Sequence, residues 1–452
     1  MKCCSRQFRV NNKQNNCRLP IVCYLLFLIF PSFSFSQTEN PPYYEKNFLR
    51  YEDYTYKKNI RTVQLQKEDW EFSAPVIKLG STEKLKLTFD DLDGESKSYK
   101  FTIIHCDANW MPSDRMLPSE YISGFFDDNI NDYQYSKNTI QRYLHYELLF
   151  PTENLKPTKS GNYLLKVFLD YEQNDLILTK CFMVIDERVN IIPDIHHATI
   201  LDEYNYKQEI DFSIQTSGYQ ITNPYQDLKV VVMQNDRWDN AITKLKPIFV
   251  KDNELTYDHD QDNVFPGGNE FRNFDIKSLR WNSEFVKSNS SDSAKKDHVY
   301  LFPGTKRNFL QYLSDRDING KYKITRQESS PAASETEAEY VYVHFTLPMK
   351  EAAENGSLYV FGALSNWKYS NENKMHYNKT LGGYEATLYL KQGYYNYEYM
   401  YLNDNEKAGD ESYIEGSHYE TENDYVIYVY HKPINSNYDQ LIGMKRFNSL
   451  TH

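Results

Sequence analysis

Strict alternation of polar and apolar residues is the feature of this sequence that most restricts its fold. Residues 84–89 and 99–106 both alternate in this way, which places every second residue on one face of an extended chain. The residues that share a face are Leu85, Leu87 and Phe89 in the first run, and Phe101, Ile103 and His105 in the second. Between the runs, Asp93 and Gly94 are residue types that tolerate a positive φ at a chain reversal. The pattern predicts a β-hairpin.

Alternating runs of this kind recur from residue 60 to residue 186. They are RTVQLQ, PVIKL, KLKLTF, YKFTIIHC, HYELLF, NYLLKVFLD and LILTKCFMVI. The chain is also rich in aromatic residues, with 40 Tyr and 25 Phe against 9 Met, and aromatic residues favour strands over helices. Seven short strands separated by turns predict an immunoglobulin-like β-sandwich. We expect an all-β protein with such domains in tandem.

The length of 452 residues suits about three domains. A linker is clearest at residues 328–339, where Ser, Ala, Pro and Glu occur without a large apolar residue. The expected order is an N-terminal leader at 37–59, a first β-sandwich at 60–189, a second β-domain at 190–327, the linker, a C-terminal β-sandwich at 340–434 and a tail at 435–452.

Residues 1–36 have the pattern of a secretory signal peptide. A basic region precedes the apolar run LPIVCYLLFLIF, and the small residues Ser34 and Ser36 stand where a signal peptidase cleaves, just before Gln37. An uncleaved membrane anchor is the alternative. The apolar run is short for a membrane span, which favours cleavage and export.

The charge balance of the exported chain restricts its partners. Residues 1–36 contain five basic and no acidic residues, so the mature chain keeps 46 basic and 63 acidic residues and a net charge of −17. Bulk electrostatics therefore disfavours binding to nucleic acid or to an anionic membrane. No later segment is apolar for long enough to span a bilayer. We expect no stable membrane insertion after cleavage.

Two cysteines, Cys106 and Cys181, lie beyond the predicted signal peptide. In an exported protein they can form one disulfide bond. Both lie in predicted strands, where a bond forms only if the two backbones are correctly spaced. Two buried free thiols are the alternative.

The residues His105, Cys106 and Asp107 place a base, a thiol and an acid in consecutive positions. Consecutive residues of a strand point to opposite faces, so His105 and Cys106 do not form the hydrogen-bonded pair that thiol catalysis requires. An exported enzyme that pairs Cys106 with a distant His is an alternative. His196 and His197 have no further ligands at zinc-site spacing. We predict no enzyme activity, no cofactor and no metal site.

A long polar and aromatic segment, LPSEYISGFFDDNINDYQYS at residues 117–136, interrupts the first predicted domain. Loops of this length inside a compact domain are uncommon and often functional. We predict that Trp110, Tyr121 and Phe125, which lie in and just before this segment, contact a partner.

The third predicted domain combines FGALSNW with GYEATLYLKQGYYNYEYMY. This layout resembles the β-sandwich modules that bind glycogen or starch, in which a Trp after the first strand stacks on sugar rings. Trp367 is at the matching position and is the candidate glycan-stacking residue. The alternative is that Trp367 closes the core of the sandwich, as Trp residues commonly do. A periplasmic carbohydrate-binding β-sandwich protein is accordingly the second functional hypothesis.

Long stretches of the chain resemble the plug protein family of the type IX secretion system. They include IKLGSTEKLKLTFDDLDGESKSYKFTIIHCDANW, LKPTKSGNYLLKVFLD, VFPGGNEFRNFDIKSLRW and EGSHYETENDYVIYVYH. The resemblance implies a non-enzymatic periplasmic protein, peripheral to the outer membrane. Its implied partner is the outer-membrane β-barrel of the translocon, whose periplasmic mouth the family's plug closes. The resemblance marks no individual contact residue.

Overall fold

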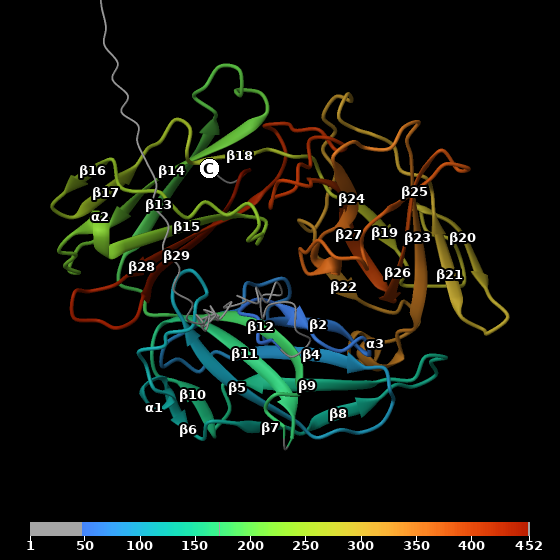
Figure 1. The fold of residues 1–452 in the computed structure, drawn as a ribbon, viewed down its shortest axis with the longest axis horizontal. Coiled ribbons are helices and arrows are strands. Elements are labelled where there is room, and N and C mark those ends of the chain that lie inside the picture. The colour runs from blue at the N-terminus through green and yellow to red at the C-terminus, as the bar shows by residue number, and fades with distance from the viewer. Residues whose placement is uncertain (1–47, 171, 451–452) are drawn as a thin grey trace, which may run out of the picture. The chain divides into compact units, whose positions relative to one another are not determined.

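Each of three lobes in the computed structural model contains two β-sheets that face each other across an apolar core (Figure 1). The structure describes residues 48–450 with the exception of residue 171. The strands of the first lobe lie within residues 54–185, those of the second lobe within 190–266 and 424–448, and those of the third lobe within 272–403. The predicted all-β fold of tandem β-sandwiches is confirmed. The predicted signal peptide lies outside the described residues.

The first lobe has a large sheet and a smaller one. The large sheet has the order β1 (Tyr54–Thr55), β12 (Leu176–Ile185), β11 (Gly161–Leu169), β5 (Tyr99–Cys106), β7 (Asp128–Ile130), and β3 (Val76–Lys78) pairs in parallel with β12. The facing sheet has the order β2 (Ile60–Lys67), β4 (Leu85–Asp91), β9 (Leu144–Phe150), β8 (Asp132–Tyr135). The segment between β5 and β7 contains the short helix α1 (Pro118–Tyr121) and β6 (Ile122–Gly124), which pairs with β10 (Leu155–Pro157).

The predicted hairpin is wrong, although both of its strands are present. Strand β4 pairs with β2 and β9, whereas β5 pairs with β11 and β7, so the two strands lie in opposite sheets. Their inward residues, such as Leu87 and Ile103, meet in the core between the sheets. Alternation requires only that one face of each strand is buried, and a partner in either sheet satisfies it. Gly94 has the expected positive φ, at +72°.

The second and third lobes have the same two-sheet plan. One sheet of the second lobe contains β13 (Asn190–His197), β14 (Lys207–Gln215), β17 (Glu254–Tyr257), β16 (Phe249–Lys251) and β18 (Val264–Pro266). Its other sheet contains β15 (Leu228–Gln234), β28 (Asp424–His431) and β29 (Gln440–Asn448), and α2 (Pro224–Asp227) precedes β15.

One sheet of the third lobe contains β20 (Val286–Ser291), β21 (Asp297–Leu301), β23 (Tyr340–Pro348), β26 (Gly383–Lys391) and β25 (His376–Asn378). The facing strands are β19 (Arg272–Asp275), β27 (Gly393–Asn403), β22 (Tyr322–Ile324) and β24 (Gly356–Phe361), and the 3-10 turn η2 (Ala363–Ser365) follows β24.

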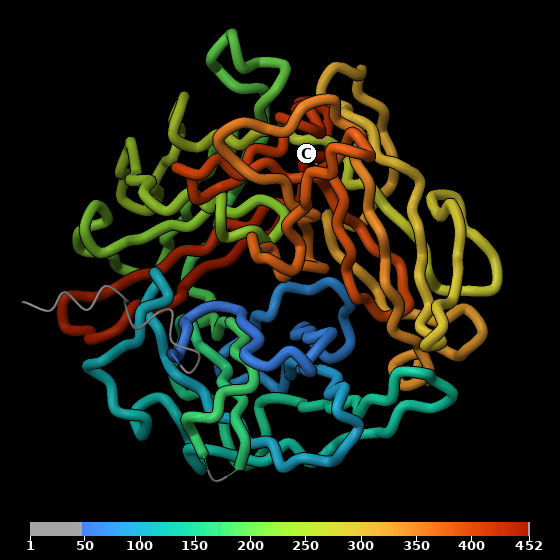
Figure 2. The backbone as a smooth tube through the Cα atoms, turned by 45° about the vertical axis from the view of Figure 1, so that its right-hand side comes forward, coloured from blue at the N-terminus to red at the C-terminus, as the bar shows by residue number. Residues whose placement is uncertain are grey.

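The predicted domain boundaries need three corrections. Residues 272–324, which we expected in the second domain, supply four strands to the third lobe. The predicted linker at 328–339 contains helix α3 (Pro331–Glu337), in which Ser334 and Thr336 are buried. The predicted tail contains β29, and the C-terminal segment runs beside the strands of the second lobe (Figure 2). A local pattern identifies strands, but it does not show which distant strand each one pairs with.

The sheet β15–β28–β29 is buried on both faces. Val230, Val232 and Ile427 point into the core of the second lobe. The alternate residues Val231, Met233, Val426 and Tyr428 pack with Met183 and Ile185 on β12 of the first lobe. Strands that are buried on both faces lose the polar alternation, which explains the continuous apolar runs LKVVVM and YVIYVYH. This sheet therefore joins the first two lobes through their apolar surfaces.

Residue Leu441 on β29 tests whether the C-terminal segment is structural. Its side chain is fully buried, whereas that of Leu450 is 62% exposed. Leu441→Ala should lower the free energy of unfolding by about 2–5 kcal/mol because it leaves a cavity in a packed interface. Leu450→Ala, the matched control, should change it by less than about 0.5 kcal/mol. Urea unfolding measures both, and an equal effect of the two substitutions would show that β29 is dispensable.

Candidate functional site

A cavity of about 340 Å³ lies where residues of all three lobes meet. Its lining includes Val63, Leu65, Phe72, Trp110 and Met183 from the first lobe, Met233, Trp238 and Tyr428 from the second, and Tyr322, Ala363 and Trp367 from the third. The lining also includes polar side chains, among them Gln64, Gln66 and Asn366, and several charged ones. Concave sites between domains that combine apolar and aromatic side chains with polar groups are typical binding sites. Two residues singled out in the sequence, Trp110 and Trp367, therefore line the same cavity although 257 positions separate them.

The three tryptophans of the cavity are fixed by contacts with other rings. Trp110 meets Trp238 edge to face, with the ring centres 5.5 Å apart. Trp367 meets Phe361 at 5.5 Å and Phe271 at 6.0 Å in the same geometry. The ring of Trp367 also passes over Gly320, where a Cβ would come within 2.2 Å of it. The lining is thus preformed by packing within and between lobes.

The charged side chains of the lining occur in ion pairs. Asp53 pairs with Lys180, Glu52 with Lys368 at 2.7 Å, and Asp236 with Lys321 at 3.2 Å. Asp239 pairs with the buried Arg237 at 3.0 Å. Because each of these acids has a cationic partner, the cavity has no strong charge of either sign.

The residues predicted to contact a partner do not form one surface. Phe125 is exposed, at 66%. Tyr121 is buried, and its ring packs against His105 and Tyr163, so its predicted place on a contact surface is wrong. The reason is that α1 turns Tyr121 into the core, where an aromatic ring gains more from burial than from exposure. Trp110 is half-buried in the cavity.

Trp367 does not present an open ring face of the kind that stacking on a sugar requires. It is half-buried, with Phe271, Phe361 and Gly320 around its ring. Its position is that of a lining residue between lobes.

The two cysteines are free thiols, so the disulfide that the sequence allowed is not formed. Strand β11 separates Cys106 on β5 from Cys181 on β12, with Leu164 of β11 opposite Cys181 and Asn162 opposite Cys106. Two strands that flank a third are about 10 Å apart, which exceeds the span of a disulfide.

The local environment of His105 and Cys106 opposes thiol catalysis. Burial lowers the pKa of His105 to about 4 and raises the pKa of Cys106 to about 12. A nucleophilic cysteine needs a lowered thiol pKa and a nearby base. His105 instead bonds to Ser113 at 2.8 Å through Nδ1 and lies at 3.2 Å from the carbonyl oxygen of Ser160 through Nε2.

The junction between the first and third lobes contains a buried ion-pair network around Asp90. Its carboxylate contacts Nδ1 of His145 at 2.7 Å, accepts a hydrogen bond from Tyr340 at 2.7 Å and pairs with Lys391 at 2.5 Å. Burial alone would raise the pKa of Asp90, but Lys391 and His145 outweigh it and hold the pKa below its ordinary value. Asp90 and His145 belong to the first lobe, and Tyr340 and Lys391 belong to the third, so the network joins the two lobes.

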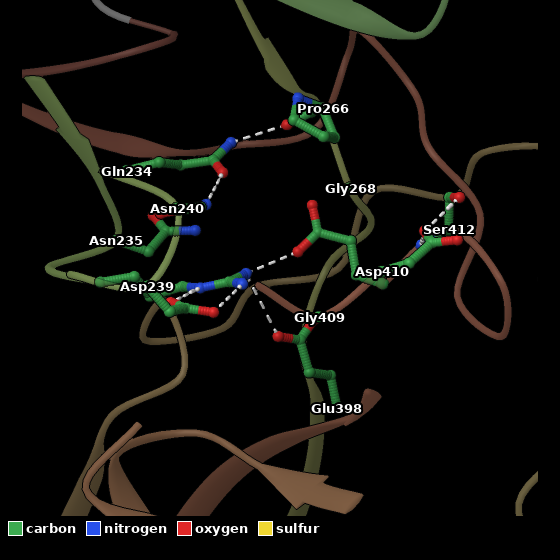
Figure 3. A network of polar contacts seen from close by, with 12 residues as sticks. Gln234, Asn235, Asp239, Asn240, Pro266, Gly268, Glu398, Gly409, Asp410 and Ser412 are labelled. Carbon is green, nitrogen blue, oxygen red and sulfur yellow. Dashed lines mark hydrogen bonds and ion pairs between the residues drawn. The ribbon is translucent and has the colours of Figure 1, made fainter. Parts of the chain in front are cut away.

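The junction between the second and third lobes contains a similar network around Arg237. Figure 3 shows this network, with its members Asp239 and Glu398 labelled. The guanidinium group pairs with Asp239 at 3.0 Å, Glu411 at 2.6 Å and Glu398 at 3.6 Å. Burial raises the pKa of Asp239, but Arg237 outweighs it and the pKa stays below its ordinary value. Burial, together with Glu411, raises the pKa of Glu398. One cation thus orders acidic groups of two lobes.

Two groups of residues in the described part of the chain have the composition of metal ligands. One is His145, Glu147 and Glu335; the other is His196, Glu209 and Asp211. In the first, Lys86 lies 2.8 Å from Glu147 and 3.3 Å from Glu335 and supplies the positive charge that a metal would bring. In the second, both carboxylate oxygens of Glu209 accept hydrogen bonds from Thr199. The carboxylates of both groups therefore already have protein partners.

Sequence reasoning missed one exposed apolar segment, at residues 309–313. The side chains of Phe309, Leu310 and Leu313 are 87%, 57% and 78% exposed. Two contacts anchor the segment: Arg307, just before it, pairs with the buried Glu415 at 2.7 Å, and Tyr312, within it, donates a hydrogen bond to Glu270. The sequence does contain a signal for this segment, because Phe309, Leu310 and Leu313 are apolar residues close together that do not alternate with polar residues as in a strand.

A search of the described helices for a membrane span found none of sufficient length and hydropathy.

Comparison with known proteins gives a family model and several solved structures that are similar to this chain. Residues 60–186, which cover the first lobe, match the model described as type 9 secretion system plug protein 1st domain. The crystal structure of a hypothetical protein from Parabacteroides merdae ATCC 43184, at 2.30 Å resolution, is 33% identical to this chain with a TM-score of 0.85. That similarity covers 88% of this chain and 100% of the other. No curated protein matches the chain.

His145 should make the stability of the protein depend on pH. Burial lowers its pKa, but Asp90 and Glu335 outweigh burial and raise the pKa above 6.5. The protonated imidazole therefore stabilises the folded protein fully below about pH 6.5, and this contribution is lost as the pH rises through the raised folded-state value. His145→Gln should weaken the fall in the free energy of unfolding between about pH 6 and pH 9.

Urea unfolding at a series of pH values measures this dependence. His376→Gln is the matched control, because His376 is exposed. If the wild type and His145→Gln lose the same stability over this range, His145 does not carry the effect.

Proposed function

The chain belongs to the type 9 secretion system plug protein family, and we propose that it binds the periplasmic mouth of the outer-membrane translocon barrel and closes it. The observation that carries this proposal is the family match over residues 60–186. The similarity to one solved structure over 88% of the chain supports a shared architecture for all three lobes.

The physical requirement for such a plug is a body that keeps its form against an open channel. Three kinds of contact join the lobes here: the apolar packing of β15–β28–β29 against β12, the Asp90 network and the Arg237 network. A buried charge that loses its partner raises the free energy of the protein. Movement of one lobe against another would separate these ion pairs, so their burial opposes such movement. A three-lobed body with joined lobes fits a plug better than three independent modules.

Partner contact through exposed aromatic and aliphatic side chains is part of the proposal. Phe125 and Phe126 are 66% and 55% exposed, and Phe309 and Leu313 are more exposed still. Large apolar side chains at the centre of an interface commonly supply most of its binding energy. We assign contact with the barrel to these two segments, and Trp110 and Tyr121 have no part in it.

We further propose that the protein is non-enzymatic and periplasmic, with residues 1–36 removed as a signal peptide. The pKa shifts of His105 and Cys106 support the first point, since both oppose activation of the thiol. The alternative of a carbohydrate-binding protein is less well supported, because Trp367 lines a cavity between the lobes and presents no exposed ring face on which a glycan chain could stack.

The proposal predicts that a tagged copy of the protein recovers the translocon barrel from detergent-solubilised envelopes. Phe125→Ser and Phe309→Ser, made together, should reduce the recovered barrel about tenfold or more, equivalent to about 1.4 kcal/mol of binding free energy. Leu201→Ser is the matched control, because Leu201 is 84% exposed on the second lobe.

Deletion of the gene provides the functional arm of the test. Cells without the protein should admit bulky antibiotics that the outer membrane normally excludes, and the wild-type copy should restore the barrier. Unchanged permeability, together with no barrel in the captured material, would refute the proposed function.

A further inference from the structure

Backbone strain is concentrated at the cavity between the lobes. Among the described residues, the aromatic residues with positive φ are Phe72, Trp110 and Trp367, at 62°, 62° and 55°. All three line this cavity, and so do Asp236 and Asn366, which also have positive φ. Positive φ is rare for bulky side chains because the Cβ collides with the backbone.

Each of these conformations is energetically unfavourable and persists only where surrounding contacts enforce it. For Trp367 those contacts are the hydrogen bond from its N–H to the carbonyl oxygen of Gly362, at 3.1 Å, and the ring contacts with Phe271 and Phe361. For Trp110 they are the hydrogen bond from its N–H to Asp107, at 3.0 Å, and the ring of Trp238. Strain of this kind clusters at ligand-binding sites.

The electrostatics of the lining selects an uncharged occupant. The acids Glu52, Asp53 and Asp236 already pair with Lys368, Lys180 and Lys321. A charged ligand would have to break one of these pairs or enter the cavity without a partner, and either event carries a desolvation cost. A neutral ring instead gains contact with the aromatic side chains and loses no hydrogen bonds.

We propose that this cavity binds a neutral, largely apolar small molecule that contains a ring. A volume of about 340 Å³ lies at the small end of the range for ligand pockets. The ligand would contact Trp110 of the first lobe, Trp238 of the second and Trp367 of the third. Binding to the folded form alone raises the free energy of unfolding, so the ligand stabilises the arrangement in which the three lobes meet.

Fluorescence titration of the purified protein with phenylnaphthylamine tests this site. This fluorescent probe is neutral and contains a phenyl ring and a naphthalene ring system. Anilinonaphthalene sulfonate has the same skeleton with one negative charge and is the matched ligand control. The neutral probe should bind saturably at one site, quench tryptophan emission and raise the midpoint of thermal unfolding. Its dissociation constant should be about tenfold or more below that of the sulfonate, because each lysine of the lining is already in an ion pair with an acid that the sulfonate would have to displace.

Ala363→Phe fills the cavity and should abolish saturable binding of the neutral probe. Ala352→Phe is the matched control, since Ala352 is exposed and outside the lining. Circular dichroism reports whether each variant is folded, and the comparison of the two probes on the wild-type protein does not depend on any variant. Absence of saturable binding, or equal affinity for both probes, overturns the proposal. If the captured translocon barrel displaces the probe, the cavity binds a polypeptide segment of the barrel, and this result also overturns the small-molecule proposal.

Discussion

Burial of one three-stranded sheet on both faces is the constraint on which the rest of the structure depends. Strands β15, β28 and β29 close the core of the second lobe on one face and cover β12 of the first lobe on the other. Two of these strands, β28 and β29, come from the C-terminal end of the chain, and β28 pairs with β15, about 200 residues earlier, while β29 pairs with β28. The residues of the third lobe therefore lie between the two parts of the second lobe in the sequence. Folding of the second lobe depends in this way on long-range pairing, which costs loop entropy and is slow to form.

The polar networks have a different role from the apolar sheet. Asp90 with Lys391 and Arg237 with Glu411 place charges at the junctions of the third lobe, where each pair is satisfied only when the lobes meet in one arrangement. Buried ion pairs contribute little net stability but penalise alternatives that leave a charge unpaired. The strained aromatic residues of the central cavity are held by the same junctions. A body joined in this way is suited to close a channel, and its cavity offers a point at which a small molecule can act on all three lobes.

Local sequence patterns predicted the elements of the fold but not their connections. Alternation located β4, β5, β11 and β12 correctly, because burial of one face is a local property. The hairpin prediction failed because β4 and β5 bury their inward faces in one core from opposite sheets. The C-terminal tail was mistaken for a peripheral segment, although the unbroken apolar run YVIYVYH before it signals burial on two faces. Trp110 and Trp367 were singled out for separate reasons, and only the three-dimensional fold brings them to one cavity. Tyr121 shows the converse, because an aromatic residue in a long loop can be a core residue.

The buried contacts between the lobes imply that the three lobes form one cooperative unit joined by the sheet β15–β28–β29. Hydrogen exchange measured across a series of denaturant concentrations tests this cooperativity, by following amides of β11, β28 and β23 as reporters of the first, second and third lobes. We expect all three groups of amides to lose protection at the same denaturant concentration, because opening one lobe breaks the buried contacts of its neighbours. Loss of protection in β23 at a clearly lower concentration, with β11 and β28 still protected, would contradict it.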